Sequence, residues 1–412
     1  MKHLILYSIC LLISITTTIR VLAQSTNEDM VQRANKLAHD FIIVDGHVDL
    51  PYRLRVSNFR LEKEYLGIPI ETDEGDFDFM RAKEGGLDAP FMSIYIPARY
   101  QEEGGAKELA DSLITLVNGI ASAHPDKFMV AFSPDDVQKA FENGTIALPM
   151  GMENGAPLED DISRVQYFKD QGISYITLTH SKDNLICDSS YDTTYTWNGL
   201  SPFGEMVVQE MNRVGIMVDI SHVSDSTFYD VLNLTKAPVI ASHSSCRKYT
   251  PGFERNMNDD MILHLAKNEG VIQINFGTTF LDGAIQAVND SLRSLLLKEL
   301  SDLGLEAEDP AGEEYVKKFR EKNPQLYADV QRVADHIDHV VSLVGVDHVG
   351  LGSDYDGVGD SLPTGLKDVG DYPNLIKELL QRGYSEEDIE KICSGNVLRV
   401  WNAVLAFSDS MK

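Results

Sequence analysis

Histidines and acids end a series of short apolar runs in this chain of 412 residues. The first run, 41–49, stops in His47-Val-Asp49, and later runs stop in a similar way. The side chains at these ends are His47, Asp49, Glu153, His180, His222, His243 and Asp354. Parallel strands of a barrel present their carboxyl-terminal residues on one face. The runs therefore predict one metal site, typical of a metal-dependent hydrolase.

The spacing of these residues indicates how they would share metal ions. His47 and Asp49 are two apart, so on an extended segment both side chains point the same way and can hold one ion. His222 and His243 end runs about one β–α repeat apart, so they should be neighbours that form a second half-site. Glu153 has two oxygens and can bridge two ions. Each residue alone is more often structural, but together they favour two ions, and these ligand types suit zinc.

Strand and helix patterns alternate along the chain. Further apolar runs typical of strands are 89–96, 127–132 and 270–276. Apolar residues at helical spacing occur over 27–40, 107–123, 160–171, 203–214 and 259–268. This alternation predicts an α/β fold with a parallel sheet covered on both faces, and about eight units favour a (β/α)8 TIM-like barrel of the metal-dependent hydrolase type. No Gly-x-Gly-x-x-Gly follows the first strand, which argues against dinucleotide binding.

Residues 281–330 interrupt the alternation with an amphipathic helix over 291–303 and an acidic stretch over 309–314. We interpret 281–330 as a helical insertion within a single barrel domain that spans 24–407. The simplest interpretation is that the insertion lies on the protein surface without a specific function. Covering the site or forming a subunit contact is the alternative.

Composition excludes one class of partner. The formal charge of −28 argues against nucleic acid as a partner, because binding phosphates requires a basic patch.

Three cysteines, Cys187, Cys246 and Cys393, lie beyond the N-terminal apolar segment and allow at most one intramolecular disulfide. No Cys-x-x-Cys pair exists, so a metal site must be built from histidines and carboxylates.

The first residues are typical of an export signal. Lys2 and His3 precede an apolar run over 4–15, and Val21-Leu-Ala23 forms a small-residue cleavage pattern. The run is too short to cross a bilayer comfortably. We therefore expect residues 1–23 to be a signal peptide and the protein to be exported, periplasmic or secreted, without a stable membrane anchor. A retained signal anchor is the alternative.

The chain resembles the membrane dipeptidases (renal dipeptidase, the M19 metallopeptidases) from about residue 32 to residue 402. The matching motifs are Val44-Asp-Gly-His-Val-Asp-Leu-Pro51, Gly151-Met-Glu-Asn-Gly155, Thr179-His180, Asp219-Ile-Ser-His222, Ser242-His-Ser-Ser245, Arg255-Asn256 and Gly352-Ser-Asp-Tyr-Asp-Gly357. The order and spacing of these motifs together are far more specific than any one of them.

The resemblance implies a dipeptidase with two zinc ions per subunit, in which a bridging hydroxide attacks the peptide bond. The implied metal ligands are His47 and Asp49 for the first zinc, His222 and His243 for the second, and Glu153 as the bridge. The implied substrate residues are His180 for the carbonyl, Arg255 for the C-terminal carboxylate and Asp354 for proton transfer, with Asp356 as an orienting neighbour. The resemblance also implies L,L- and L,D-dipeptides as substrates and a tendency to form homodimers. A β-lactam ring or a cysteinyl-glycine-type substrate stays open.

Some residues depart from the family pattern or take no part in it. The loop 246–252 is one residue longer than expected, and Gly277 stands where a tyrosine is expected to line the pocket, which predicts a wider site. His336 and His339 are three apart on a helix, where a polar helix face is favoured over a metal pair. His348 begins a strand and should face the opposite end of the barrel.

Three other functions compete with the dipeptidase. A binuclear-metal deacylase of N-acyl amino acids would need the same metals but no free substrate amine. A metal-dependent phosphoesterase would need several cations near the site, where the sequence offers only Arg247 and Arg255. A non-catalytic binding protein would not need every catalytic-type position to be filled.

Overall fold

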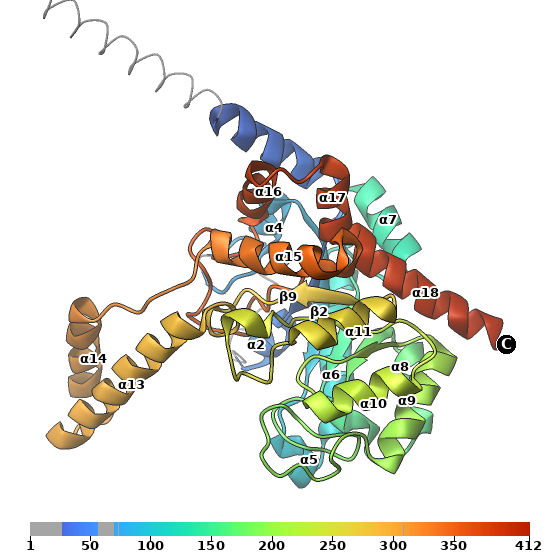
Figure 1. Ribbon diagram of the computed structural model, residues 1–412, viewed down its shortest axis with the longest axis horizontal. Coiled ribbons are helices and arrows are strands. Elements are labelled where there is room, and N and C mark those ends of the chain that lie inside the picture. The colour runs from blue at the N-terminus through green and yellow to red at the C-terminus, as the bar shows by residue number, and fades with distance from the viewer. Residues whose placement is uncertain (1–26, 57–69, 73, 308) are drawn as a thin grey trace, which may run out of the picture.

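The computed structural model describes residues 27–56, 70–72, 74–307 and 309–412 (Figure 1). The predicted signal peptide, residues 1–23, lies outside the described residues. Within the described part of the chain, no helix is both long and apolar enough to cross a bilayer.

Eight parallel strands form the central sheet, in the order β1-β2-β5-β6-β7-β8-β9-β10. Their bounds are β1 Ile43–Val48, β2 Leu87–Tyr95, β5 Met150–Glu153, β6 Ile173–Thr177, β7 Met217–Asp219, β8 Ile240–Ala241, β9 Val271–Ile274 and β10 Val349–Leu351. Nearly every residue of these strands is buried, as expected for a parallel sheet that helices cover. The predicted α/β barrel is confirmed.

The barrel closes between its first and last strands. The backbone N–H of Asp354 donates to the carbonyl of His47 over 3.1 Å, and that of Asp49 donates to Tyr355 over 2.9 Å. The buried carboxylate of Asp45 in β1 also accepts from the backbone N–H of Ser353 over 3.0 Å. The closing bonds therefore run directly beside residues that the sequence assigned to the metal site.

One predicted strand lies outside the barrel. The run 127–132 contains β3, Phe128–Val130, which pairs with β4, Ile146–Leu148, in a separate two-stranded sheet. The apolar run that leads to Glu153 is divided at Pro149, so its first part belongs to this small sheet and only its second part, β5, enters the barrel.

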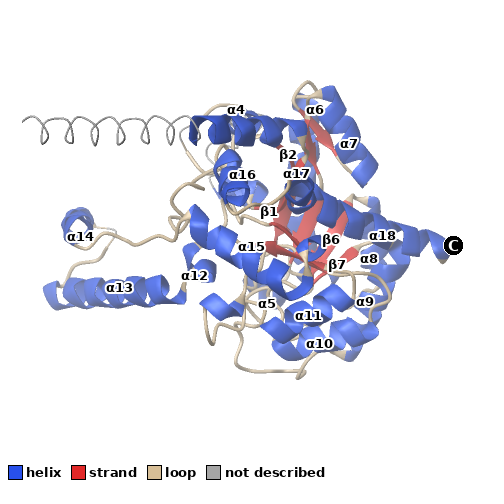
Figure 2. Ribbon diagram, turned by 45° about the horizontal axis from the view of Figure 1, so that its top comes forward, coloured by secondary structure: helices blue, strands red, loops and turns tan. Residues whose placement is uncertain are grey.

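Helices surround the barrel (Figure 2). A helix spans 27–40, and the others are α2 Leu50–Val56, α4 Phe79–Gly85, α5 Arg99–Glu103, α6 Ala106–Ala123, α7 Pro134–Asn143, α8 Ser163–Asp170, α9 Pro202–Val214, α10 Asp225–Leu234, α11 Asp259–Lys267, α12 Thr278–Leu281, α13 Gly283–Leu303, α14 Pro310–Lys322, α15 Val330–Val344, α16 Tyr372–Gln381, α17 Glu386–Glu390 and α18 Asn396–Ser410. Four single turns are η1 Ala156–Leu158, η2 Arg247–Tyr249, η3 Val346–His348 and η4 Lys391–Gly395. Side-chain caps fix several helix starts; Ser201, Ser224 and Asn258 each accept a first-turn N–H.

The amino-terminal end of the barrel is filled by an aromatic cluster. Trp401 of α18 is fully buried, and its ring centroid lies 5.3 Å from that of Phe91 in β2. Phe91 in turn packs 5.3 Å from Tyr175 of β6. The packing leaves the carboxyl-terminal end of the strands as the face on which a site can form.

The predicted insertion contains α13 and α14, which project away from the barrel as a helical arm (Figures 1 and 2). The arm has a small apolar core of its own, made by Leu296, Leu300 and Phe319. It leaves the barrel directly after α12, so α12 is anchored to the barrel while the arm extends from it.

Candidate active site

The structure brings the predicted ligands together at the carboxyl-terminal ends of six strands. The contributing residues are His47 and Asp49 from β1, Glu153 from β5, His180 after β6, His222 after β7, His243 after β8 and Asp354 after β10. Because all these strands are parallel, their ends converge on one face of the barrel.

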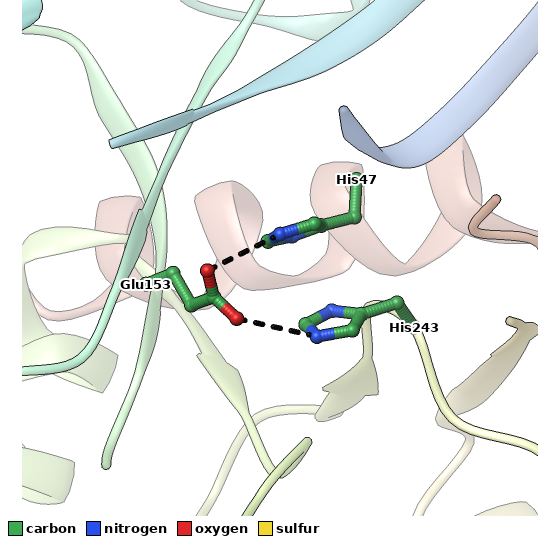
Figure 3. Close-up of side chains that lie close together, drawn as sticks. All are labelled: His47, Glu153 and His243. Atoms are coloured by element: carbon green, nitrogen blue, oxygen red, sulfur yellow. Dashed lines mark ion pairs between the residues drawn. The ribbon is translucent and has the colours of Figure 1, made fainter. Parts of the chain in front are cut away.

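Glu153 lies at the centre of the cluster (Figure 3). Its Oε2 is 3.4 Å from Nε2 of His47. Its other oxygen, Oε1, faces Nε2 of three histidines, at 3.0 Å for His222, 3.4 Å for His243 and 3.6 Å for His180. One carboxylate therefore shares its two oxygens among four imidazoles.

The donor set fits a pair of zinc-type ions. Three groups of ligand atoms each lie within 4.8 Å of one another: His47-Glu153-His243, Glu153-His180-His222 and His47-Asp49-Asp354. Glu153 belongs to two of the groups, the position expected of a bridging carboxylate. Nε2 of His47 is buried without a hydrogen-bond partner, as expected for a nitrogen that faces an ion. Imidazole and carboxylate are ligands that zinc accepts.

Buried side chains behind the ligands fix the orientation of two imidazoles. Nδ1 of His47 lies 2.9 Å from the Tyr175 hydroxyl, and Nδ1 of His243 lies 2.7 Å from Oγ of Ser242. The Ser242 hydroxyl also donates to Asp219 over 2.6 Å. These contacts occupy Nδ1 and direct Nε2 of each ring to the site, as outer partners of metal-binding histidines do.

Asn275 is a site residue that the sequence reasoning did not single out. It follows β9, one of the two barrel strands with no predicted ligand, and its Nδ2 donates to Oδ2 of Asp354 over 2.7 Å. An uncharged amide at a strand end carries no metal-binding signal. Its position after β9 was the only clue in the sequence.

Burial changes the protonation of the site residues. It lowers the pKa values of His222 and His243 well below the usual range and so favours the neutral imidazole that binds metals. Burial, together with the neighbouring carboxylates Asp49 and Glu153, raises the pKa of Asp354 to about 7. A carboxyl group with such a pKa can hold or release a proton near neutral pH.

Two of these residues adopt a backbone conformation that non-glycine residues rarely use. The φ angles are 69° at His222 and 64° at Asp354. Such conformations cost about 1–3 kcal/mol each and occur often at functional positions.

Asp356 lies beside the ligand cluster and contacts the protein scaffold. Its Oδ1 accepts from the backbone N–H of Asp76 over 2.7 Å and forms an ion pair with Nε of Arg53 at 3.0 Å. The backbone N–H of Asp356 donates back to Asp76 over 2.7 Å. These contacts hold the loop after β10, and the orienting role expected for Asp356 stays a prediction.

Arg255 is buried behind the cluster with an unpaired charge. Its Nη2 donates to the carbonyl of His243 over 2.9 Å and its Nη1 to Oγ of Ser244 over 2.6 Å. Its side chain is 3% exposed, and Nε has no hydrogen-bond partner. Within the described residues, no carboxylate lies within ion-pair distance of the guanidinium. A buried cation of this kind is costly unless an anion joins it.

The histidines of α15 are buried, so the prediction of a polar helix face was wrong. Nδ1 of His336 accepts from the backbone N–H of Cys246 over 3.0 Å, and its Nε2 donates to the carbonyl of Leu281 over 3.0 Å. His339 lies 2.7 Å from Asp259. These bonds satisfy the backbone of the loop that leads to Arg255. His348, as expected, lies at the opposite end of the barrel, 2.9 Å from the carbonyl of Gly270.

The three described cysteines, Cys187, Cys246 and Cys393, are buried and free, so they form no disulfide with one another.

A cavity of about 690 Å³ opens above the ligands. Asp49, Glu153 and Asp354 contribute to its polar side. The expectation that Gly277 widens it was wrong, because a Cβ atom at this position would lie only 2.9 Å from Cδ2 of Phe280. The space that a side chain at 277 would use is already filled.

Comparison with known proteins gives a consistent result. The family model described as membrane dipeptidase (peptidase family M19) matches residues 31–412. Dipeptidase tcpJ of Claviceps purpurea (strain 20.1) is 33% identical over 380 residues, which cover 89% of this chain and 78% of that protein. Dipeptidase 3 of Mus musculus is 32% identical over 377 residues, which cover 90% of this chain and 66% of the mouse protein.

Two solved structures share the fold. The probable dipeptidase PvdM from Pseudomonas aeruginosa has a TM-score of 0.76 and 25% identity, with 92% of this chain and 99% of that chain covered. A metallo peptidase from Rhodobacter sphaeroides, solved with a phosphinate mimic of the dipeptide L-Ala-D-Ala, has a TM-score of 0.72 and 23% identity, with 88% and 99% covered.

Proposed function

The chain belongs to the membrane dipeptidases, peptidase family M19, and is therefore a metallo-dipeptidase; we propose that it cleaves free dipeptides with two zinc ions bound around Glu153. The observation that carries the proposal is the shared carboxylate, whose two oxygens face four imidazole nitrogens at 3.0–3.6 Å. A single ion would not require a central carboxylate that reaches both halves of such a cluster.

Five side chains would hold the ions: His47, Asp49, Glu153, His222 and His243. When bound, two zinc ions supply Lewis-acid polarisation and an activated water. Tyr175 and Ser242 orient the imidazoles of His47 and His243 before any ion binds, which reduces the rearrangement that loading requires.

Asp354 carries the proton in the proposed reaction. Asn275 holds its Oδ2 at 2.7 Å, which fixes the carboxyl group beside His47 and Asp49. As water adds to the substrate carbonyl, Asp354 takes the proton from that water. It then passes the proton to the amine as the C–N bond breaks. His180, on the other side of Glu153, would donate a hydrogen bond to the carbonyl oxygen as negative charge develops there.

Arg255 anchors the C-terminal carboxylate of the substrate. The guanidinium is buried, and its Nε lacks a partner, so a carboxylate that enters the cavity would compensate its charge. This anchor explains why the substrate would have a free C-terminal carboxylate. The Rhodobacter sphaeroides structure holds a mimic of L-Ala-D-Ala, which supports including L,D-dipeptides among the substrates that we propose.

The export of the protein is a further part of this proposal. It rests on the composition of residues 1–23, with an apolar run over 4–15 and the small-residue pattern at Val21-Leu-Ala23. Sequencing the N-terminus of protein recovered outside the cytoplasm would test it. A mature chain that begins at Gln24 is expected, and one that begins at Met1 would contradict cleavage.

Kinetics on a matched pair of substrates test the function. Purified protein loaded with zinc is assayed on Ala-Ala, on L-Ala-D-Ala and on N-acetyl-Ala-Ala, and its metal content is measured. We expect two zinc ions per chain and turnover of both free dipeptides, with little turnover of the acetylated one. A preference for the acetylated substrate would refute the dipeptidase and favour the N-acyl amino acid deacylase.

A further inference from the structure

Aromatic rings form a row from Arg255 to His222, and part of this row lines the cavity. The ring centroid of Phe280 lies 5.4 Å from Cζ of Arg255 and 5.8 Å from the ring of Phe253. Phe253 is 6.1 Å from Tyr191, whose ring lies 5.9 Å from that of His222. Phe280 and Tyr191 line the cavity directly. The row therefore connects the proposed carboxylate anchor with a metal ligand.

Gly277 makes room for Phe280 in this row. A Cβ atom at 277 would lie 2.9 Å from Cδ2 of Phe280 and 3.0 Å from Cγ1 of Val358. The φ angle of Gly277 is −58°, which any residue adopts, so the glycine is needed for space and not for its backbone freedom. Phe280 thus supplies, from one turn later, the cavity wall that a side chain at 277 would otherwise form.

The ring of Phe280 is held in place from several sides. Its backbone N–H donates to the carbonyl of Gly277 over 2.9 Å, and its own carbonyl accepts from Nδ2 of Asn256 over 2.8 Å. Cζ of Arg255 lies over this ring, 5.4 Å from its centroid, in a cation–π contact, and Nε of Arg255 has no hydrogen-bond partner. Phe280 is 9% exposed, so the ring is packed and not free to swing aside.

We propose that Phe280 determines which C-terminal side chains the enzyme accepts. This inference rests on the proposed function, because it takes the substrate carboxylate to be bound at Arg255. In an amino acid only the α-carbon separates the carboxylate from the side chain. A carboxylate bound by Arg255 therefore brings the C-terminal side chain close to the ring of Phe280, which lies 5.4 Å from Cζ of Arg255. Small C-terminal residues fit beside this ring, and large ones must displace it.

Two series of substrates separate this effect from a general loss of activity. The full-length, zinc-loaded protein is assayed on Ala-Gly, Ala-Ala, Ala-Leu and Ala-Phe, which vary the C-terminal residue. Leu-Ala and Phe-Ala vary the N-terminal residue. The variants are Phe280→Ala, which opens the space, and Phe280→Leu, which keeps an apolar side chain and protects folding. Phe132→Ala, a matched truncation at an exposed ring that does not line the cavity, is the control.

We expect Phe280→Ala to raise the ratio of kcat/KM for Ala-Phe over Ala-Ala by about tenfold or more, chiefly through KM. Phe280→Leu should change this ratio in the same direction by less. The ratio for Phe-Ala over Ala-Ala should stay within about twofold in both variants, and Phe132→Ala should change neither ratio.

Three results would overturn the inference. An equal loss on every substrate would show a structural role only, and an equal shift in both series would show that Phe280 does not face the C-terminal residue. Unchanged ratios in a Phe280→Leu variant that melts like the wild type would show that the ring sets no specificity. A wild-type protein that cleaves no dipeptide would instead overturn the proposed function, and this inference with it.

Discussion

Replacing Arg255 with glutamine should weaken the enzyme selectively toward substrates that carry a C-terminal carboxylate. The guanidinium is buried without a carboxylate partner, and two hydrogen bonds already direct it toward the site. A bidentate contact with a substrate carboxylate adds two charge-assisted hydrogen bonds of about 1.5–3 kcal/mol each. Arg255→Gln should therefore cost about 3–6 kcal/mol in kcat/KM for Ala-Ala, roughly 10²- to 10⁴-fold.

The assay is a double-mutant cycle between the residue and the substrate. Wild type and Arg255→Gln are compared on Ala-Ala and on its C-terminal amide, which has no negative charge. The amide should lose much less activity on substitution, which gives a coupling energy of about 2 kcal/mol or more. Arg247→Gln is the matched control, since Arg247 already pairs with Asp225 at 2.5 Å.

Equal losses on Ala-Ala and its amide would refute this reasoning and leave Arg255 with a structural role. Because Nη2 of Arg255 donates to the carbonyl of His243, a proposed metal ligand, zinc content must be measured in each variant. A drop in zinc content alone would lower activity on both substrates by the same factor. The control variant should show no coupling with the substrate carboxylate.

Three further predictions concern the proposed proton carrier, the central carboxylate and acid stability. Asp354→Asn should keep its zinc and lower kcat by about 10²- to 10⁴-fold; unchanged turnover would exclude proton transfer by Asp354. Glu153→Gln should lower the zinc content measured by elemental analysis. Adding Gln273→Glu to this variant supplies a carboxylate outside the ligand set, so it should not restore the zinc content. Burial lowers the pKa of His336 to about 4 from 6.5, so its contribution to stability is present above pH 6.5 and is lost as the pH falls toward 4. Urea unfolding should show that wild type loses about 2 kcal/mol more than His336→Gln between pH 7 and pH 5, and equal losses would contradict this assignment.

The barrel and its ligands could be predicted because their signals are local. Apolar runs that end in His47, Glu153 or His243 carry both the strand and the ligand in a few adjacent residues. Parallel strands then bring these ends together without further information. The run 127–132 was harder to place, because periodicity identifies a strand but not the sheet that it joins.

Contacts between distant segments could not be predicted in the same way. The backbone N–H of Cys246 finds Nδ1 of His336, a residue 90 positions later, and nothing near either residue signals the pairing. Phe280 reaches the cavity only because Gly277 has no side chain, so predicting its place requires positions 277 and 280 to be considered together. Asn275 carries no charge, and its importance follows from its contact with Asp354.

The closure of the barrel has a consequence for the order in which the protein becomes functional. Asp45 accepts the backbone N–H of Ser353 across 308 positions of chain, and the same seam sets Asp354 beside His47. During synthesis the ribosome releases β1 long before β10, so the first ligands exist for most of translation without their last neighbour. Contacts of such long sequence separation form late in folding. Activity, rather than metal binding, is thus tied to completion of the chain, because a prematurely truncated product would lack Asp354 together with the seam that holds it.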